Sequence, residues 1–253
     1  MKQERASQNE TSIIPPSAIR HPPSEDFSRY DQKLEFILRN AARIFAEKGY
    51  HSTSMRDISR ETGVSLAGLY YYCRSKEELL FLIQDNCFGR VLERLEQRLE
   101  ETTGGIEKLR LVIENHLSFF AANMAEMKVL SHEADSLEGE MYEHVSGKKQ
   151  QYTSLVRRIL SEVQQGQDEQ QQQQQARRKI DLTVATYALF GMMNWIYNWY
   201  DPRGKLSVSD LVDNITRLFL GGFLAGMMSE EQSWRAKTTR RGERLSVWRG
   251  PLI

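Results

Sequence analysis

Residues 52–80 read STSMRDISRETGVSLAGLYYYCRSKEELL, and this stretch decides the fold. Ser54 and Asp57 have the spacing of a capping box, in which a hydroxyl and a carboxylate satisfy the free amides at the start of a helix. Gly63 is a stop signal for that short helix, and Ser65 after it can cap the next one. Two short helices joined by a tight turn are the layout of a helix-turn-helix unit.

The sequence on both sides of this stretch completes a helical unit. Apolar residues recur at spacings of three and four from Gln32 onward and a glycine follows them, which predicts a helix in front of the unit. Ser75 and Glu78 form a second capping-box pattern, which predicts a long fourth helix that ends near Thr103. Residues 1–29 contain four of the six prolines and charges that cancel, so we predict a disordered tail there.

The rest of the chain predicts an all-α protein, because it carries helical periodicity and no strand-like alternation. We predict further helices over 106–124, 126–137, 139–164, 178–200 and 208–228. The predicted domains are a three-helix helix-turn-helix domain over 30–80 and a helical domain over 81–229, with a glutamine-rich loop at 164–175 and a basic tail at 230–253. The tail is either free or an auxiliary nucleic-acid contact.

Three adjacent tyrosines, Tyr70, Tyr71 and Tyr72, lie on the second short helix. Successive helical residues are rotated by about 100°, so these rings cannot all face one core. Gly68 in the same helix costs about 1 kcal/mol relative to alanine, which makes sense where another backbone or a phosphate approaches closely. Lys76, at the next helix start, is unfavourable without a nearby anion, unless it simply points into water. This segment therefore presents a surface that meets another molecule.

Composition excludes several classes of protein. Lys and Arg number 34 and Asp and Glu number 34, so the chain lacks the overall positive charge of non-specific nucleic-acid binders. Two cysteines without metal-ligand or disulfide spacing, and an N-terminus without a signal-peptide pattern, predict a cytoplasmic protein. The apolar stretch Leu182–Tyr200 contains Thr and Asn residues, so we interpret it as a buried bundle helix rather than a membrane span.

The segment AARIFAEKGYHSTSMRDISRETGVSLAGLYYYCRSKEELL, residues 41–80, resembles the DNA-binding domain of TetR/AcrR-type bacterial transcription regulators. The resemblance implies a homodimer in which each recognition helix, residues 65–72, enters the major groove of one half of a near-palindromic operator. It implies DNA contacts from the starts of three helices and from two tyrosines: Ser54, Arg56, Ser65, Leu66, Ala67, Gly68, Tyr70, Tyr71 and Lys76. Leu69 and Cys73 should turn inward, and Cys73 departs from the phenylalanine that is usual in the family.

The second half resembles the branch of this family that senses acyl-CoA thioesters in fatty-acid, aromatic or sterol breakdown, and the string NWIYNWYDPRGKLS, residues 194–207, is the specific part. The resemblance implies an apolar ligand cavity with nearby cations, formed by Tyr187, Phe190, Met193, Asn194, Trp195, Tyr197, Trp199, Arg157 and Arg158, with Lys148 and Lys149 as further cations. Some relatives carry arginines on the helix that holds Phe190 and Asn198 here. Their absence keeps free fatty acids, other lipophilic compounds and a coenzyme A held by different cations as alternatives. An aromatic core without ligand is the alternative to a cavity.

The last predicted helix is apolar on one side and contains several glycines. Glycines weaken a helix, so their presence in an apolar one suggests close packing against a partner helix. We predict that the helices at 178–200 and 208–228 form a two-fold interface as a four-helix bundle, through Leu211, Ile215, Leu218, Phe219, Gly222, Phe223 and Gly226. Tight packing within one subunit is the alternative.

The chain carries no motif of an enzyme. His116, His132 and His144 give no HExxH or comparable ligand spacing, and no nucleophile motif or phosphate-binding glycine loop is present. We therefore expect no catalytic residue, no metal and no cofactor. The sequence predicts a repressor released from DNA by a lipophilic effector; an architectural DNA-binding protein without an effector is the alternative, and the long apolar C-terminal half argues against it.

Overall fold

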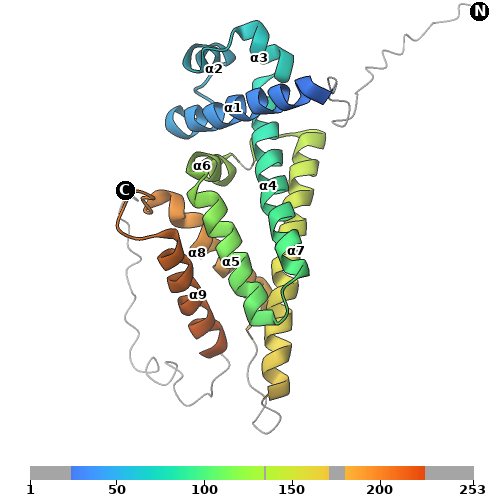
Figure 1. The fold of residues 1–253 in the computed structure, drawn as a ribbon, viewed down its shortest axis with the longest axis vertical. Helices are drawn as coiled ribbons and strands as arrows, with labels where there is room; N and C mark the ends of the chain where they lie inside the picture. Colours follow the sequence, from blue (N-terminus) through green and yellow to red (C-terminus); the bar gives the residue numbers. More distant parts are fainter. Residues whose placement is uncertain (1–23, 134, 171–179, 226–253) are drawn as a thin grey trace, which may run out of the picture. The chain divides into compact units, whose positions relative to one another are not determined.

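The computed structural model describes residues 24–133, 135–170 and 180–225. Within these ranges the architecture is helical and contains no strand, so the all-α prediction is confirmed (Figure 1). The chain divides into two compact units, the first ending at Ile83 and the second starting at Gln84. The helix α4 (Lys76–Glu100) begins in the first unit and continues into the second.

Three helices and the first turns of α4 make up the first unit. The three are α1 (Ser24–Lys48), α2 (Met55–Thr62) and α3 (Leu66–Tyr72). Each helix contributes apolar side chains with no exposed surface to a common core, which contains Ile37, Ile44, Ile58, Leu69, Leu79 and Leu80. Because α3 has only 7 residues, its stability comes from this burial and not from helix propensity alone.

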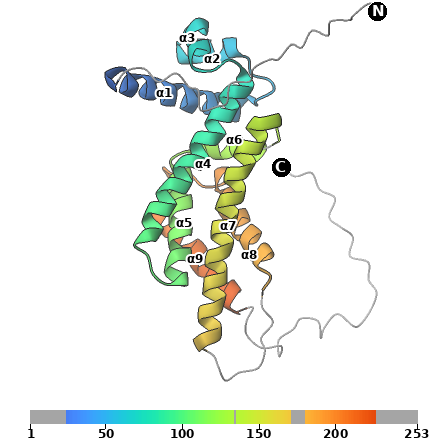
Figure 2. The same cartoon turned by 90° about the vertical axis from the view of Figure 1, so that its right-hand side faces the viewer.

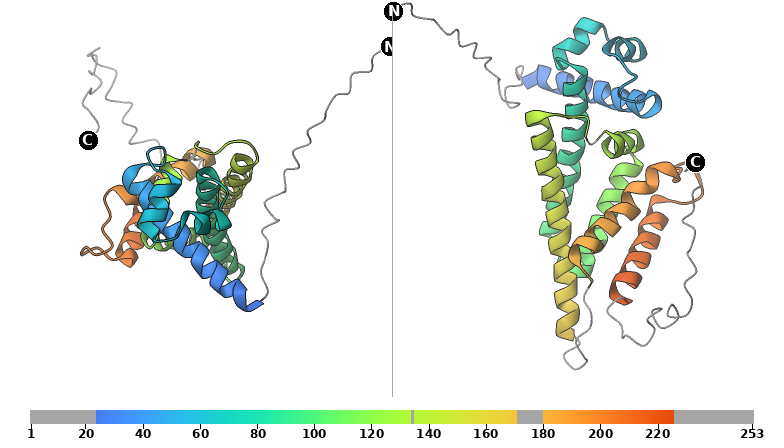
Figure 3. Two further views of the ribbon diagram at one scale, coloured as in Figure 1. Left: turned by 90° about the horizontal axis from the view of Figure 1, so that it is seen from above. Right: turned by 180° about the vertical axis from the view of Figure 1, so that it is seen from behind.

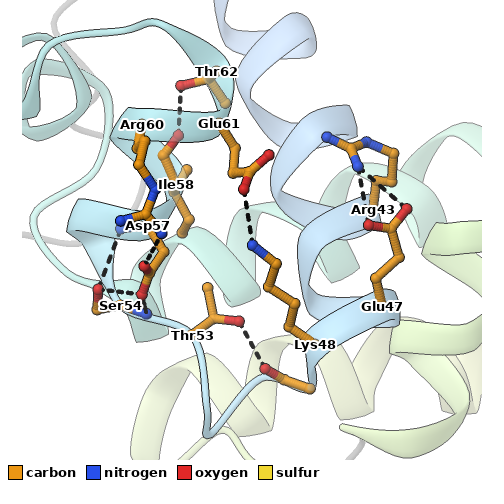
Figure 4. Close-up of polar contacts among 11 residues, drawn as sticks. Arg43, Glu47, Lys48, Thr53, Ser54, Asp57, Ile58, Arg60, Glu61 and Thr62 are labelled. Atoms are coloured by element: carbon orange, nitrogen blue, oxygen red, sulfur yellow. Dashed lines mark hydrogen bonds and ion pairs between the residues drawn. The ribbon is translucent and has the colours of Figure 1, made fainter.

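The local sequence explains how α2 and α3 begin. Ser54 Oγ accepts a hydrogen bond from Asp57 N (3.2 Å) and Ser54 N donates to Asp57 Oδ2 (3.0 Å), so the predicted capping box is present (Figure 4). Gly63 follows α2 with a φ of 66°, a left-handed conformation that favours glycine. Ser65 then accepts from Gly68 N at 3.0 Å and caps α3 as predicted.

One predicted helix start and one predicted capping box differ from the structure. The helix α1 begins at Ser24, so residues 24–29 are helical and not part of a disordered tail, because Pro23 precedes and two acidic residues follow this serine. Residues 1–23 lie outside the described ranges. Glu78 N donates to Ser75 Oγ at 3.0 Å as predicted, but the Glu78 carboxylate bonds to Arg74 N and to the Arg74 guanidinium instead of closing the capping box.

The second unit contains the rest of α4 and five further helical segments. They are α5 (Gly105–Ala121), α6 (Met124–His132), α7 (Gly139–Gln170), α8 (Leu182–Asn194) and α9 (Val208–Ala225), with a short 3-10 helix (Trp195–Asn198) directly after α8. The helix α5 packs against both α7 and α9 (Figure 2). Seen from behind in Figure 3, α8 and α9 run next to each other, and α8 also contacts α7.

Close helix packing in this unit depends on Gly105 at the start of α5. A Cβ atom at this position would lie 2.8 Å from Val163 N and 3.1 Å from Glu162 C, which are backbone atoms of α7. Because backbone atoms cannot move aside as a flexible side chain can, only glycine fits here. The first turn of α5 is therefore held directly against α7.

Two boundaries in the second unit correct the sequence prediction. The predicted glutamine-rich loop at 164–175 is helical as far as Gln170, where α7 ends, because glutamine is a good helix former and Gln164 is buried. Gln164 Nε2 donates to Ile180 O (2.8 Å), which ties α7 to the segment before α8. The predicted helix at 178–200 begins only at Leu182, because Asp181 Oδ1 accepts from Thr183 N and Val184 N and caps α8.

The membrane alternative finds no support in the helix lengths. The apolar stretch that raised it is divided between α8, a 3-10 turn and the residues after it. No helix of the described ranges has the length and apolarity needed to cross a bilayer. The residues 171–179, and the basic tail predicted at 230–253, lie outside the described part of the chain.

Candidate functional site

The helix α3 presents two sides that match the predicted recognition helix. Leu69 and Cys73 are 0% and 2% exposed and face the core of the first unit, which confirms their inward orientation. Tyr70 and Tyr71 are 47% and 67% exposed. Large aromatic side chains left this accessible beside polar surface are typical of a binding face. Ser65, Leu66 and Ala67 at the start of the helix are also exposed or half-buried.

The third tyrosine does not share this exposure. The ring centroid of Tyr72 lies 4.8 Å from that of Tyr30 on α1, and the Tyr71 ring lies 5.9 Å from Tyr30 in an edge-to-face arrangement. Aromatic pairs at these distances stabilise each other by about 0.5–1.5 kcal/mol beyond their area burial. Tyr30 therefore braces the C-terminal end of α3, a role that the sequence did not indicate because Tyr30 lies some forty residues away.

The space around Gly68 is limited by the first unit itself. A Cβ atom on Gly68 would lie 3.0 Å from Ser65 Oγ and 3.1 Å from a methyl carbon of Val64. These contacts are tight because the Ser65 hydroxyl is the cap that accepts the Gly68 amide hydrogen bond. The capping serine is sufficient to explain a glycine here, and DNA contact by Gly68 stays a prediction.

Lys76 has partners inside the first unit. Its ammonium donates to Tyr50 O at 2.9 Å and lies 4.3 Å from the centroid of the Tyr50 ring. The water-pointing alternative is therefore wrong. Lysine carries three donors, so one bond to a carbonyl leaves capacity for a phosphate oxygen, and that contact stays a prediction. Ser54 and Arg56, the other predicted DNA contacts, are both exposed.

Several charged side chains around α2 and the end of α1 form ion pairs with one another (Figure 4). Lys48 Nζ lies 2.8 Å from Glu61 Oε1, Arg60 lies 2.6 Å from Asp57, and Arg43 pairs with Glu47 on α1. The hydrogen bonds from the Ser54 side chain and backbone, helped by Arg60, lower the pKa of Asp57 to about 2. The Asp57 carboxylate therefore stays ionised, as a hydrogen-bond acceptor at the start of a helix should be.

The second unit contains a cavity of about 760 Å³. It lies among side chains of α4 to α8, and aromatic and apolar residues dominate its wall. The lining residues are Phe88, His116, Phe120, Met127, Leu130, Ser131, Ser146, Lys149, Gln150, Tyr152, Thr153, Ser154, Tyr187, Phe190, Gly191, Asn194, Trp195 and Tyr197. A volume of this size and a mainly apolar lining are typical of small-molecule sites.

The cavity brings together some of the predicted ligand residues and not others. Five of them line it: Tyr187, Phe190, Asn194, Trp195 and Tyr197. Met193 is fully buried away from the lining because it faces the core, and Trp199, which lies beyond the 3-10 turn, is 53% exposed. Arg157 and Arg158 are exposed on α7 and do not line the cavity, because α7 turns its small polar side chains and Lys149 toward the space.

Lys149 is the one charged residue among the lining side chains just named, while Lys148 pairs with Asp85 on α4. Burial lowers the pKa of Lys149, and the nearby Asp135 offsets part of that effect. The Lys149 ammonium also lies 5.7 Å from the Phe88 ring centroid. A half-buried cation beside aromatic rings is a suitable contact for an anionic group of a ligand.

His116 and Tyr152 form a buried polar pair on the cavity wall. His116 Nδ1 lies 3.0 Å from Tyr152 Oη, and the two side chains come from α5 and α7. Burial lowers the pKa of His116 to about 3, an effect that the nearby Asn194 amide only partly offsets, and burial raises the pKa of Tyr152. Both groups are therefore neutral at physiological pH.

The neutral state of His116 makes the stability of the second unit depend on pH. Its folded pKa of about 3 is lower than the ordinary value of 6.5, so below pH 6.5 the unfolded chain binds a proton that the folded chain does not. Between pH 7 and pH 5 we expect the wild type to lose about 2 kcal/mol more unfolding free energy than His116→Phe. Urea unfolding followed by tryptophan fluorescence measures this loss. All four tryptophans come after Gln84 in the sequence, so their fluorescence reports on the second unit. Equal losses in both proteins would contradict it.

The predicted dimer residues fall into two groups. Leu211, Ile215 and Phe219 are 2%, 6% and 7% exposed, so the structure places them in the core of their own unit and not on its surface. This corrects the prediction, because the apolar stripe of α9 packs against α5. Leu218 is 69% exposed and Gly222 is also exposed. The side chain of Phe223, and Gly226, lie outside the described part.

Family models match both units. The model of bacterial regulatory proteins of the tetR family matches residues 37–83, and the model of the tetracyclin repressor-like C-terminal domain matches residues 102–223. The first range contains α2 and α3 with their caps, and the second contains most of the cavity wall.

Several individual proteins resemble the chain along most of its length. The fatty acid metabolism regulator protein of Bacillus subtilis (strain 168) is 29% identical over 74% of this chain and 93% of its own length. The HTH-type transcriptional repressor KstR2 of Mycolicibacterium smegmatis is 25% identical over 79% of this chain and 93% of its own. The crystal structure of AibR in complex with isovaleryl coenzyme A and operator DNA is 28% identical, with a TM-score of 0.62, and covers 74% of this chain and 97% of AibR. The chain belongs to the TetR family of bacterial transcriptional regulators.

Proposed function

We propose that this regulator is a repressor that binds a near-palindromic operator as a homodimer and leaves it when an acyl-CoA thioester occupies the cavity of the second unit. The observation that carries the proposal is the aromatic-walled cavity of about 760 Å³ with Lys149 in its lining. An acyl chain would bury its methylene groups there, each worth about 0.8 kcal/mol. The lysine would contact a phosphate group of coenzyme A.

Two similar proteins support an acyl-CoA effector over other lipophilic compounds. The Bacillus subtilis relative is a fatty acid metabolism regulator, and AibR was crystallised with an acyl-CoA and operator DNA together. A ligand releases DNA only if it binds the DNA-free conformation more tightly than the DNA-bound one. A change from mostly bound to mostly free requires a difference in affinity of about 10⁴-fold.

Exposed apolar side chains on α8, the 3-10 turn and α9 support a homodimer. Val184 and Tyr187 are each 63% exposed, Trp195 is 60% exposed and Leu218 is 69% exposed. Apolar residues gathered on neighbouring helices of one unit are typical of a surface that a second subunit covers. The proposed interface therefore uses this exposed face of α8 and α9 in place of the buried stripe of α9.

The proposal is tested with the DNA upstream of the gene for this protein, labelled for fluorescence anisotropy. We expect the full chain to bind this DNA, and dodecanoyl-CoA to release it at micromolar concentration. Dodecanoate and free coenzyme A, which each supply half of the ligand, should not release it at the same concentrations. Release by dodecanoate alone would contradict the thioester, and persistence of the complex with every compound would contradict acyl-CoA control.

A further inference from the structure

Three polar side chains from three different helices meet on the wall of the cavity. They are His116 on α5, Tyr152 on α7 and Asn194 at the end of α8, and all three line the space. Their surroundings are aromatic, with the Phe120 and Phe190 ring centroids 4.7 Å and 6.0 Å from that of His116. Polar groups in such surroundings are costly unless each finds a hydrogen-bond partner.

The contact between His116 and Tyr152 determines which ring nitrogen carries the proton. If Nδ1–H donated to the tyrosine oxygen, the tyrosine proton and the Nε2 lone pair would both lack partners in the described part of the chain. If the Tyr152 hydroxyl donates to Nδ1 across the 3.0 Å contact, only one group is left without a partner. The second arrangement satisfies more groups, so Nε2 of the neutral ring carries the proton and acts as a donor.

This Nε2–H group has no acceptor of ordinary geometry among the described residues, although the His116 side chain is only 2% exposed. The Asn194 side chain interacts with the ring as a weak hydrogen-bond partner that raises its pKa slightly, but this contact lacks ordinary hydrogen-bond geometry and leaves Nε2 unsatisfied. A buried donor without an acceptor costs about 1–3 kcal/mol of stability. Phenylalanine at this position would avoid that cost, so a histidine here points to an acceptor supplied by a ligand.

We propose that His116 donates a hydrogen bond from Nε2 to the carbonyl oxygen of the effector's acyl group. Tyr152 is the positioning residue, because its hydroxyl holds the ring in the tautomer that donates. The inference rests on the proposed function, and it adds that the thioester carbonyl itself is recognised inside the cavity. A neutral donor among aromatic rings suits a neutral carbonyl and not a carboxylate, whose charge would be costly to bury there.

Two ligands that differ only at the carbonyl group can test this inference. Dodecanoyl-CoA carries the carbonyl, and its thioether counterpart S-dodecyl-CoA has a methylene group in its place. Both offer the same chain length and the same phosphates, so apolar burial and the contacts of Lys149 are matched. Only the carbonyl can use the His116 donor. Where no donor is present, burying the carbonyl is a penalty, and the thioether becomes the better ligand.

Calorimetric titration of the full chain with these two compounds tests the inference. We expect the wild type to bind the thioester about tenfold more tightly than the thioether, the effect of one hydrogen bond. In His116→Phe the thioether should bind as in the wild type, while the thioester should bind more weakly than the thioether. In His116→Gln, which keeps an N–H donor, part of the preference should return. Tyr152→Phe should reduce the preference without abolishing thioether binding.

Each outcome decides a separate point. Equal binding of both compounds to the wild type would overturn the inference and leave the proposed function intact, since an acyl-CoA would still bind. Failure of both compounds to bind would overturn the proposed function itself. A preference that survives unchanged in a folded His116→Phe variant would also overturn the inference. If that variant lacks a cooperative thermal transition, the wild-type comparison and Tyr152→Phe decide instead.

Discussion

Tyr70→Ala is expected to weaken binding of the operator by about 100-fold. Tyr70 is 47% exposed on the outward side of α3, and no aromatic ring of the described residues contacts it. Its removal therefore costs little stability. A lost contact to DNA of about 1.4 kcal/mol in each half-site would count twice in the proposed dimer, which corresponds to the 100-fold loss.

Two matched variants make this result specific. Tyr142→Ala removes a tyrosine of nearly equal exposure, 44%, from α7 in the second unit, and it should leave operator affinity unchanged. Tyr70→Phe separates the two predicted kinds of contact, because it would remove a hydroxyl bond to a phosphate but keep an apolar contact with a thymine methyl group. Fluorescence anisotropy measures all three proteins. If Tyr70→Ala binds like the wild type, α3 does not meet DNA through this face.

The helix-turn-helix part of the fold could be predicted because its signals are local. The capping box of Ser54 and Asp57 is a pattern of residues three apart, and Ser65 caps α3 by the same kind of contact. The inward orientation of Leu69 follows from helical rotation alone. Tyr30 was missed because its contact with Tyr72 joins residues that only the folded chain brings together.

The cavity could be predicted only in part. The residues of α8 that line it belong to one aromatic string, but Phe88, Phe120, Met127 and Tyr152 come from other helices. Apolar periodicity shows that such residues point inward, and it does not show whether the interior is filled or hollow. The buried contact between His116 and Tyr152 depends on the distance between α5 and α7, which no spacing along the chain contains.

The dimer residues show a related limit. An apolar stripe on α9 indicates that one side is buried, but the same stripe serves equally well against α5 in its own unit or against a second subunit. The structure places Leu211, Ile215 and Phe219 against the unit's own core and leaves Leu218 outside. The glycines of α9 predict close packing against a partner helix, and within the subunit nothing lies within 4 Å of a Cβ atom added at Gly221 or Gly222, so tight packing inside one subunit does not explain these two glycines.

Gly191→Phe is expected to abolish the response to effector while operator binding persists. Gly191 lies on α8 in the lining of the cavity, and nothing lies within 4 Å of a Cβ atom added there. A phenylalanine ring can therefore be added here without disturbing the backbone, and helix propensity slightly favours the change. Gly191 is exposed and lies one helical turn from Tyr187 and Trp195 of the proposed subunit interface, so the variant must also be shown to keep its assembly. The ring would occupy volume that the acyl chain needs. We expect the dodecanoyl-CoA concentration for half-release to rise by about 100-fold, corresponding to about 2.8 kcal/mol.

Gly147→Phe is the matched control for this variant. Gly147 is also a helical glycine with nothing within 4 Å of an added Cβ atom, but it lies on α7 outside the cavity lining. It should release operator at the wild-type concentration of dodecanoyl-CoA. Anisotropy of the labelled operator measures the response of both variants, and sedimentation checks that the mass of their assembly in solution is that of the wild type. If Gly191→Phe responds like Gly147→Phe, the effector does not occupy this part of the cavity, and release must begin at a different site.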